Sequence, residues 1–542
     1  MNLRQDDISF ILVLTAAVGV TGFSFSAGNG SEGIYYAAMP LLAFLVFSSV
    51  FAQGAENFLA VQFAQRVRKG KITDAILFFK SALVCGALAG LVAVLAGVLL
   101  GRLLGVFLWS NGNTALAMYT LAPGCLFMGL LGPCLGILKS AGRKNLLQIL
   151  YTAFLIACVV LGCIFGRMFS YRGEKIALLL RNDTYAAVYG GAGIGIGVSL
   201  AALLALIAAA VLIAPILGSF RSREDRMEID HDEEMRDIVP YCFRKLVPCF
   251  PVGLLPLGFF LVDMRIAQAF LPTGAEASKS FGSILGIAGA YAFGMAGLIL
   301  FRMIGVIKLP LRSFQKRHKA FREQYSMIYE IPAFVAAPAA LFMPAAAHSI
   351  LQMTKSGLEQ HPRESALAAL RFGFPFLFFL VFAVLALVFT WRAGFKNAVY
   401  SALTIAGIGQ IAVLYICSSF FTGEYALFPA LDAFAVLAFC LCILMTRRGL
   451  LGSADSYYLQ IWWRALGASL IAAIPVGFLD GYIASEIIPV GGVVLLLMLF
   501  LIIYLPLSIM MGALNPSDLE WMWFSRSLRR LMQRLGRGGE DR

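Results

Sequence analysis

Apolar runs of about twenty residues follow one another along the whole chain, and they constrain its fold more than any other feature. Of the 542 residues, 60% are hydrophobic and only 13% are charged, which is far from the composition of a soluble domain. A backbone in lipid must satisfy its own hydrogen bonds, so runs of this length are expected to form transmembrane helices. The sequence therefore predicts an all-α polytopic membrane protein.

The runs predict about fourteen transmembrane helices. Every second connection between them carries Lys and Arg, for example Arg66–Lys71 and Lys316–Lys319. Cytoplasmic connections are enriched in these residues, so both termini are expected in the cytoplasm, with the first run retained as a helix. The predicted spans are 8–27, 34–60, 76–100, 114–138, 146–166, 186–216, 245–270, 280–310, 327–350, 365–391, 397–420, 425–446, 462–482 and 487–511.

Two basic turns recur in the second half of the chain. Ala141–Asn145 returns as Ala393–Asn397, at an offset of 393 − 141 = 252 residues, and Gln65–Lys71 returns as Gln315–Lys319, at 315 − 65 = 250. Both copies of each turn lie on the same predicted side, which favours a parallel repeat. The expected organisation is an N-terminal lobe of six helices (1–216), a cytoplasmic linker (217–240), a C-terminal lobe of six helices (241–448), a further helix pair (449–515) and a basic cytoplasmic tail (516–542).

Several function classes are disfavoured. The net charge of +13 comes from short clusters between apolar runs, so we expect no nucleic-acid partner. The ten Cys and four His show no metal-ligand spacing, and no catalytic triad or carboxylate pair stands out, so we expect no metal, no cofactor and no enzyme. The glycine run 190–197 lacks the Lys of a nucleotide loop and predicts close helix packing. The basic helix expected over 524–537 suits anionic lipid headgroups.

Polar residues inside the second and eighth spans are candidates for a substrate cavity. A charge at the bilayer centre costs about 2.5–3.5 kcal/mol, so it is expected to face a cavity or a partner. Gln53, Glu56 and Asn57 share one helical face. Arg302 could clamp a diphosphate through its guanidinium. The alternatives are that Glu56 pairs with a nearby base, and that Arg302 snorkels or pairs with Glu56.

Other charged residues near span ends are candidates for an ion site, a gate or a mouth. Asp263 and Arg265 could form a gate or a water-exposed pair, or Asp263 could bind Na⁺ or H⁺. Asp432, which lies within the twelfth predicted span, is a further ion candidate. Four residues at the predicted cytoplasmic mouth could attract phosphate, with snorkelling as the alternative: Lys80, Arg143, Arg244 and Lys245.

Four stretches, in this order and spacing, resemble the multidrug/oligosaccharidyl-lipid/polysaccharide (MOP) flippase superfamily. They are Gly33–Tyr36 with Met39–Leu41, Leu121–Pro123 with Lys139–Asn145, Leu261–Asp263, and Tyr329–Pro332. The chain is most similar to the polysaccharide-export and stage V sporulation protein B-like branch, to which the lipid II flippase MurJ is related.

This resemblance implies two six-helix lobes in a V around a central cavity, plus two C-terminal helices similar to those that form a lipid-binding groove in MurJ. It also implies a flippase that carries a lipid-linked oligosaccharide or cell-wall precursor across the bacterial cytoplasmic membrane by alternating access. In the lipid II branch, arginines on the first, second and eighth helices line the cavity. Only Arg302 corresponds here, which favours another polyprenyl-linked glycan or a different cavity chemistry.

Two other functions remain open from the sequence. A multidrug/cation antiporter of the same superfamily predicts a carboxylate-dominated cavity, which Glu56 and Asp263 would suit. A membrane glycan polymerase or ligase is disfavoured because the longest expected outer connection, 167–185, is short. We expect coupling to Na⁺, H⁺ or the membrane potential, and a monomer whose partners are the lipid-linked glycan, membrane lipids and glycan-synthesis enzymes.

Overall fold

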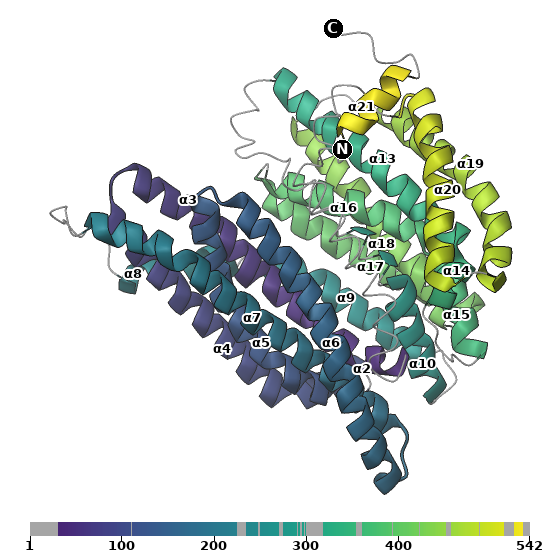
Figure 1. Ribbon diagram of the computed structural model, residues 1–542, viewed down its shortest axis with the longest axis horizontal. Helices are drawn as coiled ribbons and strands as arrows, with labels where there is room; N and C mark the ends of the chain where they lie inside the picture. The colour runs from purple at the N-terminus through teal and green to yellow at the C-terminus, as the bar shows by residue number, and fades with distance from the viewer. Residues whose placement is uncertain are drawn as a thin grey trace. The chain divides into compact units, whose positions relative to one another are not determined.

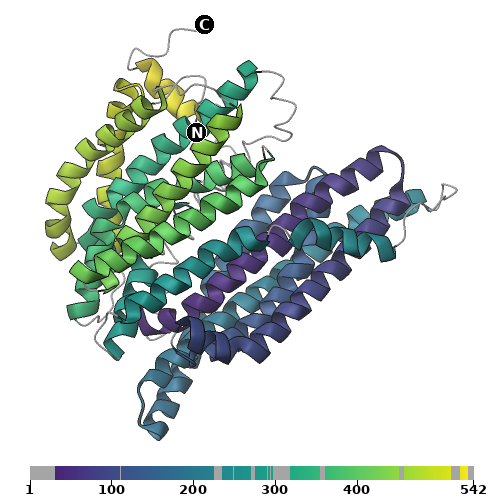
Figure 2. The same cartoon turned by 180° about the vertical axis from the view of Figure 1, so that it is seen from behind.

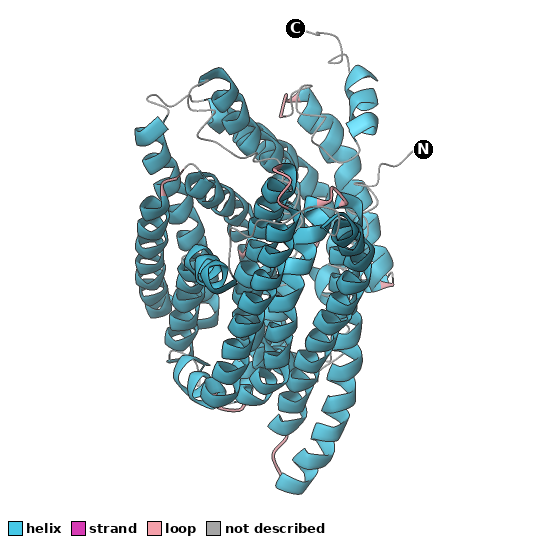
Figure 3. Cartoon of the chain, turned by 90° about the vertical axis from the view of Figure 1, so that its left-hand side faces the viewer, coloured by secondary structure: helices cyan, strands magenta, loops and turns pink. Residues whose placement is uncertain are grey.

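The computed structural model describes residues 31–109, 111–224, 235–247, 250–269, 275–289, 291–292, 295–296, 299, 318–353, 360–392, 394–421, 423–450, 457–486, 488–513 and 525–534. Every regular element in these residues is a helix (Figures 1 and 3). Two of them, η1 and η3, are π-helices. The elements are α2 (Ser31–Ser48), η1 (Ser49–Gly54), α3 (Ala55–Arg68), α4 (Ile72–Trp109), α5 (Thr114–Ser140), α6 (Lys144–Leu180), α7 (Thr184–Glu224), α8 (Met235–Leu246), α9 (Phe250–Ala269), α10 (Ala275–Ser283), η3 (Ile284–Gly289), α13 (His318–Ala345), α14 (Ala347–Met353), α15 (Gln360–Phe372), α16 (Phe374–Arg392), α17 (Lys396–Phe420), α18 (Gly423–Leu450), α19 (Tyr457–Glu486), α20 (Pro489–Met510) and α21 (Ser525–Arg534).

Ten helical spans in the described residues are long and apolar enough to cross a bilayer, and each overlaps with a predicted span. Large apolar side chains such as Leu99, Phe478 and Ile502 are well exposed on them, as expected for surfaces that face lipid. The protein is therefore a multi-pass membrane protein. Of the other predicted spans, 8–27 and most of 280–310 lie outside the described residues, 245–270 contains α9, and 327–350 contains most of α13 and α14. The full count of about fourteen stays a prediction.

The helices form two compact units whose boundary lies between Leu261 and Val262, inside α9. The N-terminal unit contains α2 to α8, and the C-terminal unit contains α10 to α21. The amphipathic helix α8 buries Ile238, Cys242 and Leu246 and packs on α4 of the N-terminal unit. Its residues 241–246 were expected in the second lobe, but their i, i+4 apolar spacing gives α8 a face that fits the first unit.

Helix α5 is the centre of the N-terminal unit. It packs against α2, α3, α4, α7 and η1, and its apolar stretch is 78% buried, compared with 28% for α4. Glycines allow this close packing. A Cβ atom on Gly132 would lie 2.5 Å from the carbonyl oxygen of Phe51 in η1, and one on Gly129 would lie 2.3 Å from that of Gly86 in α4. Backbone therefore meets backbone along α5.

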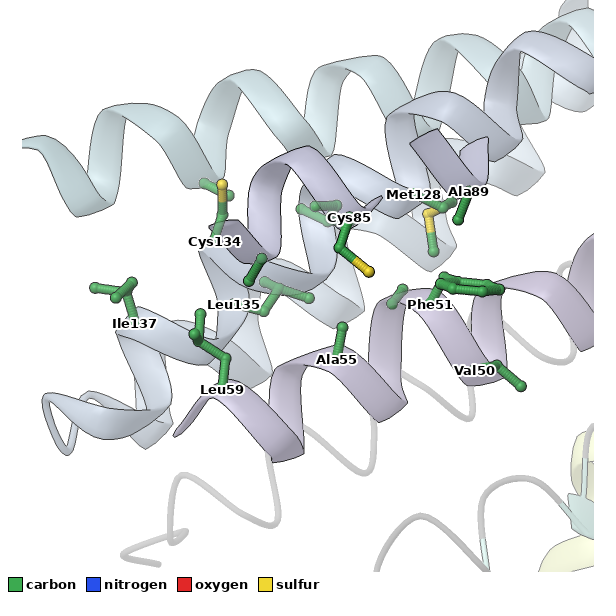
Figure 4. Packing of buried hydrophobic residues seen from close by; sticks show 14 of the residues in the cluster. Val50, Phe51, Ala55, Leu59, Cys85, Ala89, Met128, Cys134, Leu135 and Ile137 are labelled. Atoms are coloured by element: carbon green, nitrogen blue, oxygen red, sulfur yellow. The ribbon is translucent and has the colours of Figure 1, made fainter. Parts of the chain in front are cut away.

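The core around α5 joins the π-helix η1 to its neighbours. Figure 4 shows Phe51, Leu59, Cys85, Met128 and Leu135 packed together from η1, α3, α4 and α5, and all five are buried. A π-helix adds residues to a turn and changes the direction of the side chains that follow. This change occurs just before Glu56 in the chain.

The glycine run of α7 packs helices together, which confirms the prediction for 190–197. A Cβ on Gly191 would lie 2.9 Å from the carbonyl oxygen of Gly33 in α2, and one on Gly193 would lie 2.3 Å from that of Phe165 in α6. These positions have no room for a nucleotide phosphate, because neighbouring backbone occupies the space.

The connection between α6 and α7 is shorter than expected. Helix α6 continues to Leu180 and α7 begins at Thr184, so most of the predicted loop 167–185 is helical and the connection is only 181–183. Arg181 ends α6 in the left-handed conformation, with φ 51°. In Figure 2 the paired ends of α6 and α7 extend beyond the neighbouring helices of their unit.

The two copies of the basic turn have the same backbone structure, as a repeat predicts. Gly142 and Gly394 both have positive φ, 75° and 97°, which glycine adopts without strain. They occupy equivalent positions in the two copies of the sequence repeat. Three backbone hydrogen bonds also match between the copies: Gly142 to Lys139, Arg143 to Leu138 and Leu147 to Arg143 in one turn, and Gly394 to Trp391, Phe395 to Thr390 and Val399 to Phe395 in the other.

The helix pair α19–α20 is part of the C-terminal unit. Trp462 of α19 lies 4.4 Å from the ring of Phe382 in α16, measured between ring centroids. The buried hydroxyl of Tyr504 in α20 donates to the carbonyl of Phe334 in α13 at 2.6 Å. The pair is thus held to the unit by both aromatic packing and a buried hydrogen bond.

We expect Gly132→Ala to destabilise the protein, because the new methyl group would collide with the η1 backbone. Overpacking of this kind typically costs about 1–3 kcal/mol. Gly477→Ala in α19 is the matched control, since a Cβ there meets nothing within 4 Å. Thermal unfolding in detergent should show a lower midpoint for Gly132→Ala only. Equal midpoints for the two variants would contradict the close contact.

Candidate functional site

The carboxylate of Glu56 is the centre of a buried polar cluster in the N-terminal unit. Glu56 lies on α3 and is only 3% exposed. The ammonium Nζ of Lys139, at the end of α5, lies 2.6 Å from Glu56 Oε1 and donates to Asn57 Oδ1 at 2.5 Å. The hydroxyl of Tyr151 on α6 donates to Glu56 Oε2. Three helices thus meet at one carboxylate.

Glycine packing accounts for the position of Lys139. A Cβ on Gly136 would lie 3.1 Å from the carbonyl oxygen of Glu56, so α5 and α3 are in close contact one turn before Lys139. That contact brings the ammonium within reach of the buried carboxylate. A buried charge is costly unless it is paired and hydrogen-bonded, and here both carboxylate oxygens have donors.

The residues of the predicted polar face of the second span differ in their exposure. Gln53 and Asn57 are exposed, whereas Glu56 points into the unit. Asn57 also donates from its amide to the carbonyl of Gln53 at 2.8 Å. The base that pairs with Glu56 is Lys139, a residue of the basic turn that the sequence marked only as a sign of topology.

Asp263 of α9 is fully buried in the C-terminal unit. Its Oδ2 accepts a hydrogen bond from the amide of Gln410 in α17, and its Oδ1 has no hydrogen-bond partner among the described residues. Arg265, two residues further along the chain, is exposed. Asp263 therefore has an acceptor atom available for a cation or a proton.

Asp432 lies at a similar level to Gln410 along the α17–α18 hairpin. Gln410 is in the second half of α17, and Asp432 is in the first half of α18. These two helices pack against each other as consecutive, antiparallel neighbours. In the described part of the chain, Oδ1 of Asp432 is also a buried oxygen with no hydrogen-bond partner. The C-terminal unit thus holds two carboxylates, Asp263 and Asp432, each with a buried Oδ1 that has no hydrogen-bond partner among the described residues.

A further buried carboxylate, that of Asp480, is not among the site residues predicted from the sequence. Asp480 of α19 is 2% exposed and accepts from the backbone N–H groups of His348 at 2.8 Å and Ser349 at 3.0 Å. Its Oδ2 also lies 3.1 Å from His348 Nδ1. Arg371 of α15 approaches the other ring nitrogen of His348 at 3.4 Å. Asp480 thus satisfies the first N–H groups of α14, which follows a break after α13.

The remaining candidates are at surfaces or outside the described residues. The mouth candidates Lys80, Arg143, Arg244 and Lys245 are all exposed, on α4, the α5–α6 turn and α8. Arg302 lies outside the described residues. Among those that are described, no group of three or more His, Cys, Asp or Glu could hold a metal ion.

Sequence reasoning missed Lys139, Tyr151, Gln410 and Asp480 as site residues. Gln410 carried a signal, since it is an amide within an apolar run. Asp480 also carried one, because it is an acidic residue at the end of the thirteenth predicted span. Tyr151 carried none, because tyrosines are common at the ends of membrane helices.

The chain is similar to solved structures of transporters. No family model matches it, and no curated protein matches its sequence. A structure of the lipid II flippase MurJ in an inward closed conformation matches with a TM-score of 0.61 and 14% identity, covering 92% of this chain and 96% of MurJ. The fold resembles that of MOP superfamily transporters. The inward-facing conformation of a multidrug resistance MATE family transporter of this superfamily matches with a TM-score of 0.57 and 14% identity, covering 83% of this chain and 95% of the transporter. An outward-facing conformation of such a transporter matches with a TM-score of 0.53 and 14% identity, covering 82% of this chain and 94% of the transporter.

These matches confirm the predicted resemblance at the level of the fold. The matched proteins are transporters, which are not enzymes.

We expect Asp480→Ala to destabilise the protein by about 1–3 kcal/mol, because two backbone N–H groups of α14 would lose their acceptor. His348→Ala is the control, since it removes only a half-exposed side-chain contact and leaves both backbone bonds in place. Thermal unfolding should rank Asp480→Ala clearly below His348→Ala. The reverse ranking would show that the imidazole contact matters more than the backbone bonds.

Proposed function

We propose that this protein is a flippase that moves a lipid-linked oligosaccharide or cell-wall precursor across the bacterial cytoplasmic membrane by alternating access. The observation that carries the proposal is the extent of the MurJ match, 92% of the chain against 83% for the inward-facing MATE transporter. The difference is similar to the share of the chain that the α19–α20 pair, Tyr457–Met510, takes up. The proposed flippase has this helix pair in addition to the twelve helices of its two lobes.

The anchoring of α19–α20 supports a functional role for this pair. Trp462, Asp480 and Tyr504 attach it to the C-terminal unit at three positions along its length. A pair held so firmly can form one wall of a groove for a lipid tail, the role that the resemblance to MurJ suggests. The tail would then stay in the bilayer while polar residues replace part of the headgroup's hydration.

The pairing of Glu56 disfavours the multidrug/cation antiporter. A cationic drug needs a carboxylate that is free to receive it, and Glu56 already has an ammonium at 2.6 Å and a phenol. Binding of a cation at Glu56 would require Lys139 to leave. Asp263 keeps this alternative open in the C-terminal unit, since it is a buried carboxylate with an oxygen that has no partner among the described residues.

We further propose that Asp263, Gln410 and Asp432 form the site of a coupling ion, Na⁺ or H⁺. Carboxylate and amide oxygens suit a hard cation, and a proton is the alternative occupant of a buried carboxylate. The glycan substrate, membrane lipids and glycan-synthesis enzymes are the proposed partners of a monomer whose two termini lie in the cytoplasm.

A reconstituted flipping assay with several undecaprenyl-linked glycans tests the function. We expect flipping by the wild type and a loss of at least about tenfold in Arg302→Ala and Glu56→Ala, because each removes a proposed contact or support for the phosphates. Lys396→Ala, in the turn equivalent to 141–145, is a control that should flip normally. Unchanged flipping in both test variants would remove these site assignments, and no flipping by the wild type would refute the function.

The ion site makes a separate prediction. Asp263→Asn keeps the hydrogen-bonding shape but removes the charge, so transport should no longer depend on the Na⁺ or proton gradient. Initial flipping rates in proteoliposomes, with and without each imposed gradient, measure this. Asp432→Asn should weaken the same dependence if the two residues share an ion. A gradient response equal to that of the wild type in Asp263→Asn would exclude Asp263 as the ion ligand.

A further inference from the structure

The ammonium of Lys139 has one donor more than Glu56 and Asn57 use. An ammonium carries three N–H donors. Within the described residues, Glu56 Oε1 and Asn57 Oδ1 accept two of them. The side chain of Lys139 is 35% exposed, whereas that of Glu56 is 4% exposed. The third donor is therefore available at the surface of the N-terminal unit.

The surface next to Lys139 is polar although it belongs to a membrane-spanning helix. Gln53 of η1 and Asn57 of α3 are exposed one turn apart on the span Glu32–Arg68, next to the end of α5 that carries Lys139. Amide groups facing hydrocarbon would lack hydrogen-bond partners, which is costly. On α4 of the same unit, by contrast, the exposed residues Val92, Leu95 and Leu99 are apolar, as lipid contact requires. The surface at Lys139 is thus suited to water or to a polar ligand.

The cluster holds the lysine in one position. The Glu56 carboxylate accepts hydrogen bonds from Lys139 at one oxygen and from Tyr151 at the other, so both of its oxygens have a donor. The ammonium is consequently the outward, positive end of the pair. A lysine on an exposed surface normally loses side-chain entropy when it binds a ligand, and this loss is smaller here because Glu56 and Asn57 already order it.

We propose that Lys139 binds the phosphate oxygens of the transported lipid-linked glycan, with the exposed amide of Gln53 as a neighbouring donor. Glu56 is then a positioning residue, which acts on the substrate only through Lys139. This inference rests on the proposed flippase function and adds a phosphate contact in the N-terminal unit, at the predicted cytoplasmic end of α5. It also explains why a buried carboxylate is compatible with an anionic substrate.

Ligand binding to the purified full-length protein tests the proposal. The probes are undecaprenyl diphosphate and, as the uncharged control, undecaprenol, and the readout is the shift in thermal unfolding as a function of probe concentration. The diphosphate should stabilise the wild type. Lys139→Gln should need at least about tenfold more diphosphate for the same shift, while its response to undecaprenol stays unchanged. Lys139→Arg should retain most of the response. An equal diphosphate response in wild type and Lys139→Gln would overturn the proposal.

A charge exchange separates phosphate binding from a purely structural ion pair. The double variant Glu56→Lys with Lys139→Glu keeps opposite charges between α3 and α5 but places the carboxylate outward. If the pair is only structural, both the unfolding midpoint and the diphosphate shift should recover relative to Lys139→Gln. Our proposal predicts that the diphosphate shift remains lost. If the double variant does not fold, the comparison of Lys139→Gln with Lys139→Arg decides.

Flipping assays distinguish this inference from the function on which it rests. We expect the wild type to flip diphosphate-linked glycans, and Lys139→Gln to flip them with a raised KM and a similar kcat. This result supports both the proposed function and the role of Lys139. An unchanged KM in that variant overturns the role of Lys139 alone. A wild type that flips none of these substrates overturns the proposed function, and the diphosphate shift then still reports on the lysine.

Discussion

The structure depends on one constraint, which is that lipid offers no hydrogen bonds to polar groups inside a membrane protein. Each buried carboxylate must find donors within the chain. Glu56 finds them on Lys139 and Tyr151, and Asp263 finds one on Gln410. Asp480 uses the first N–H groups of α14. These contacts join helices that are distant in sequence, so satisfying the polar groups also fixes the packing.

Close backbone contact is what makes the cluster at Glu56 possible. The glycines of α5 remove side chains at the positions where α4, η1 and α3 cross it. Gly132 sits against the π-helix η1, and Gly136 sits against Glu56 itself. The same helix then ends just after Lys139. One sequence pattern of small residues thus leads to a helix contact, the contact leads to an ion pair, and the ion pair presents a cation at a polar surface.

The two units share a turn but differ in where they place their buried carboxylates. The turns around Gly142 and Gly394 match bond for bond at the offset of the sequence repeat. Each unit also contains a π-helix, η1 in one and η3 in the other. Glu56 nevertheless follows η1 on α3, whereas Asp263 lies on α9, before η3 in the chain. The two units therefore share the geometry of this turn while their buried carboxylates lie on different helices.

The sequence by itself determined the all-helical class of the fold, ten of the spans and the turn repeat. Long apolar runs have few alternatives to transmembrane helices, and a glycine with basic neighbours after such a run has few alternatives to a turn. The sequence also located Glu56 and Asp263, because charges in apolar runs are conspicuous. Their partners could not be predicted, since Lys139, Tyr151 and Gln410 are 83, 95 and 147 residues away from them. Only the tertiary structure decided that Glu56 is buried and Lys139 partly exposed, because that depends on the π-turn of η1 and on how closely α5 approaches α3.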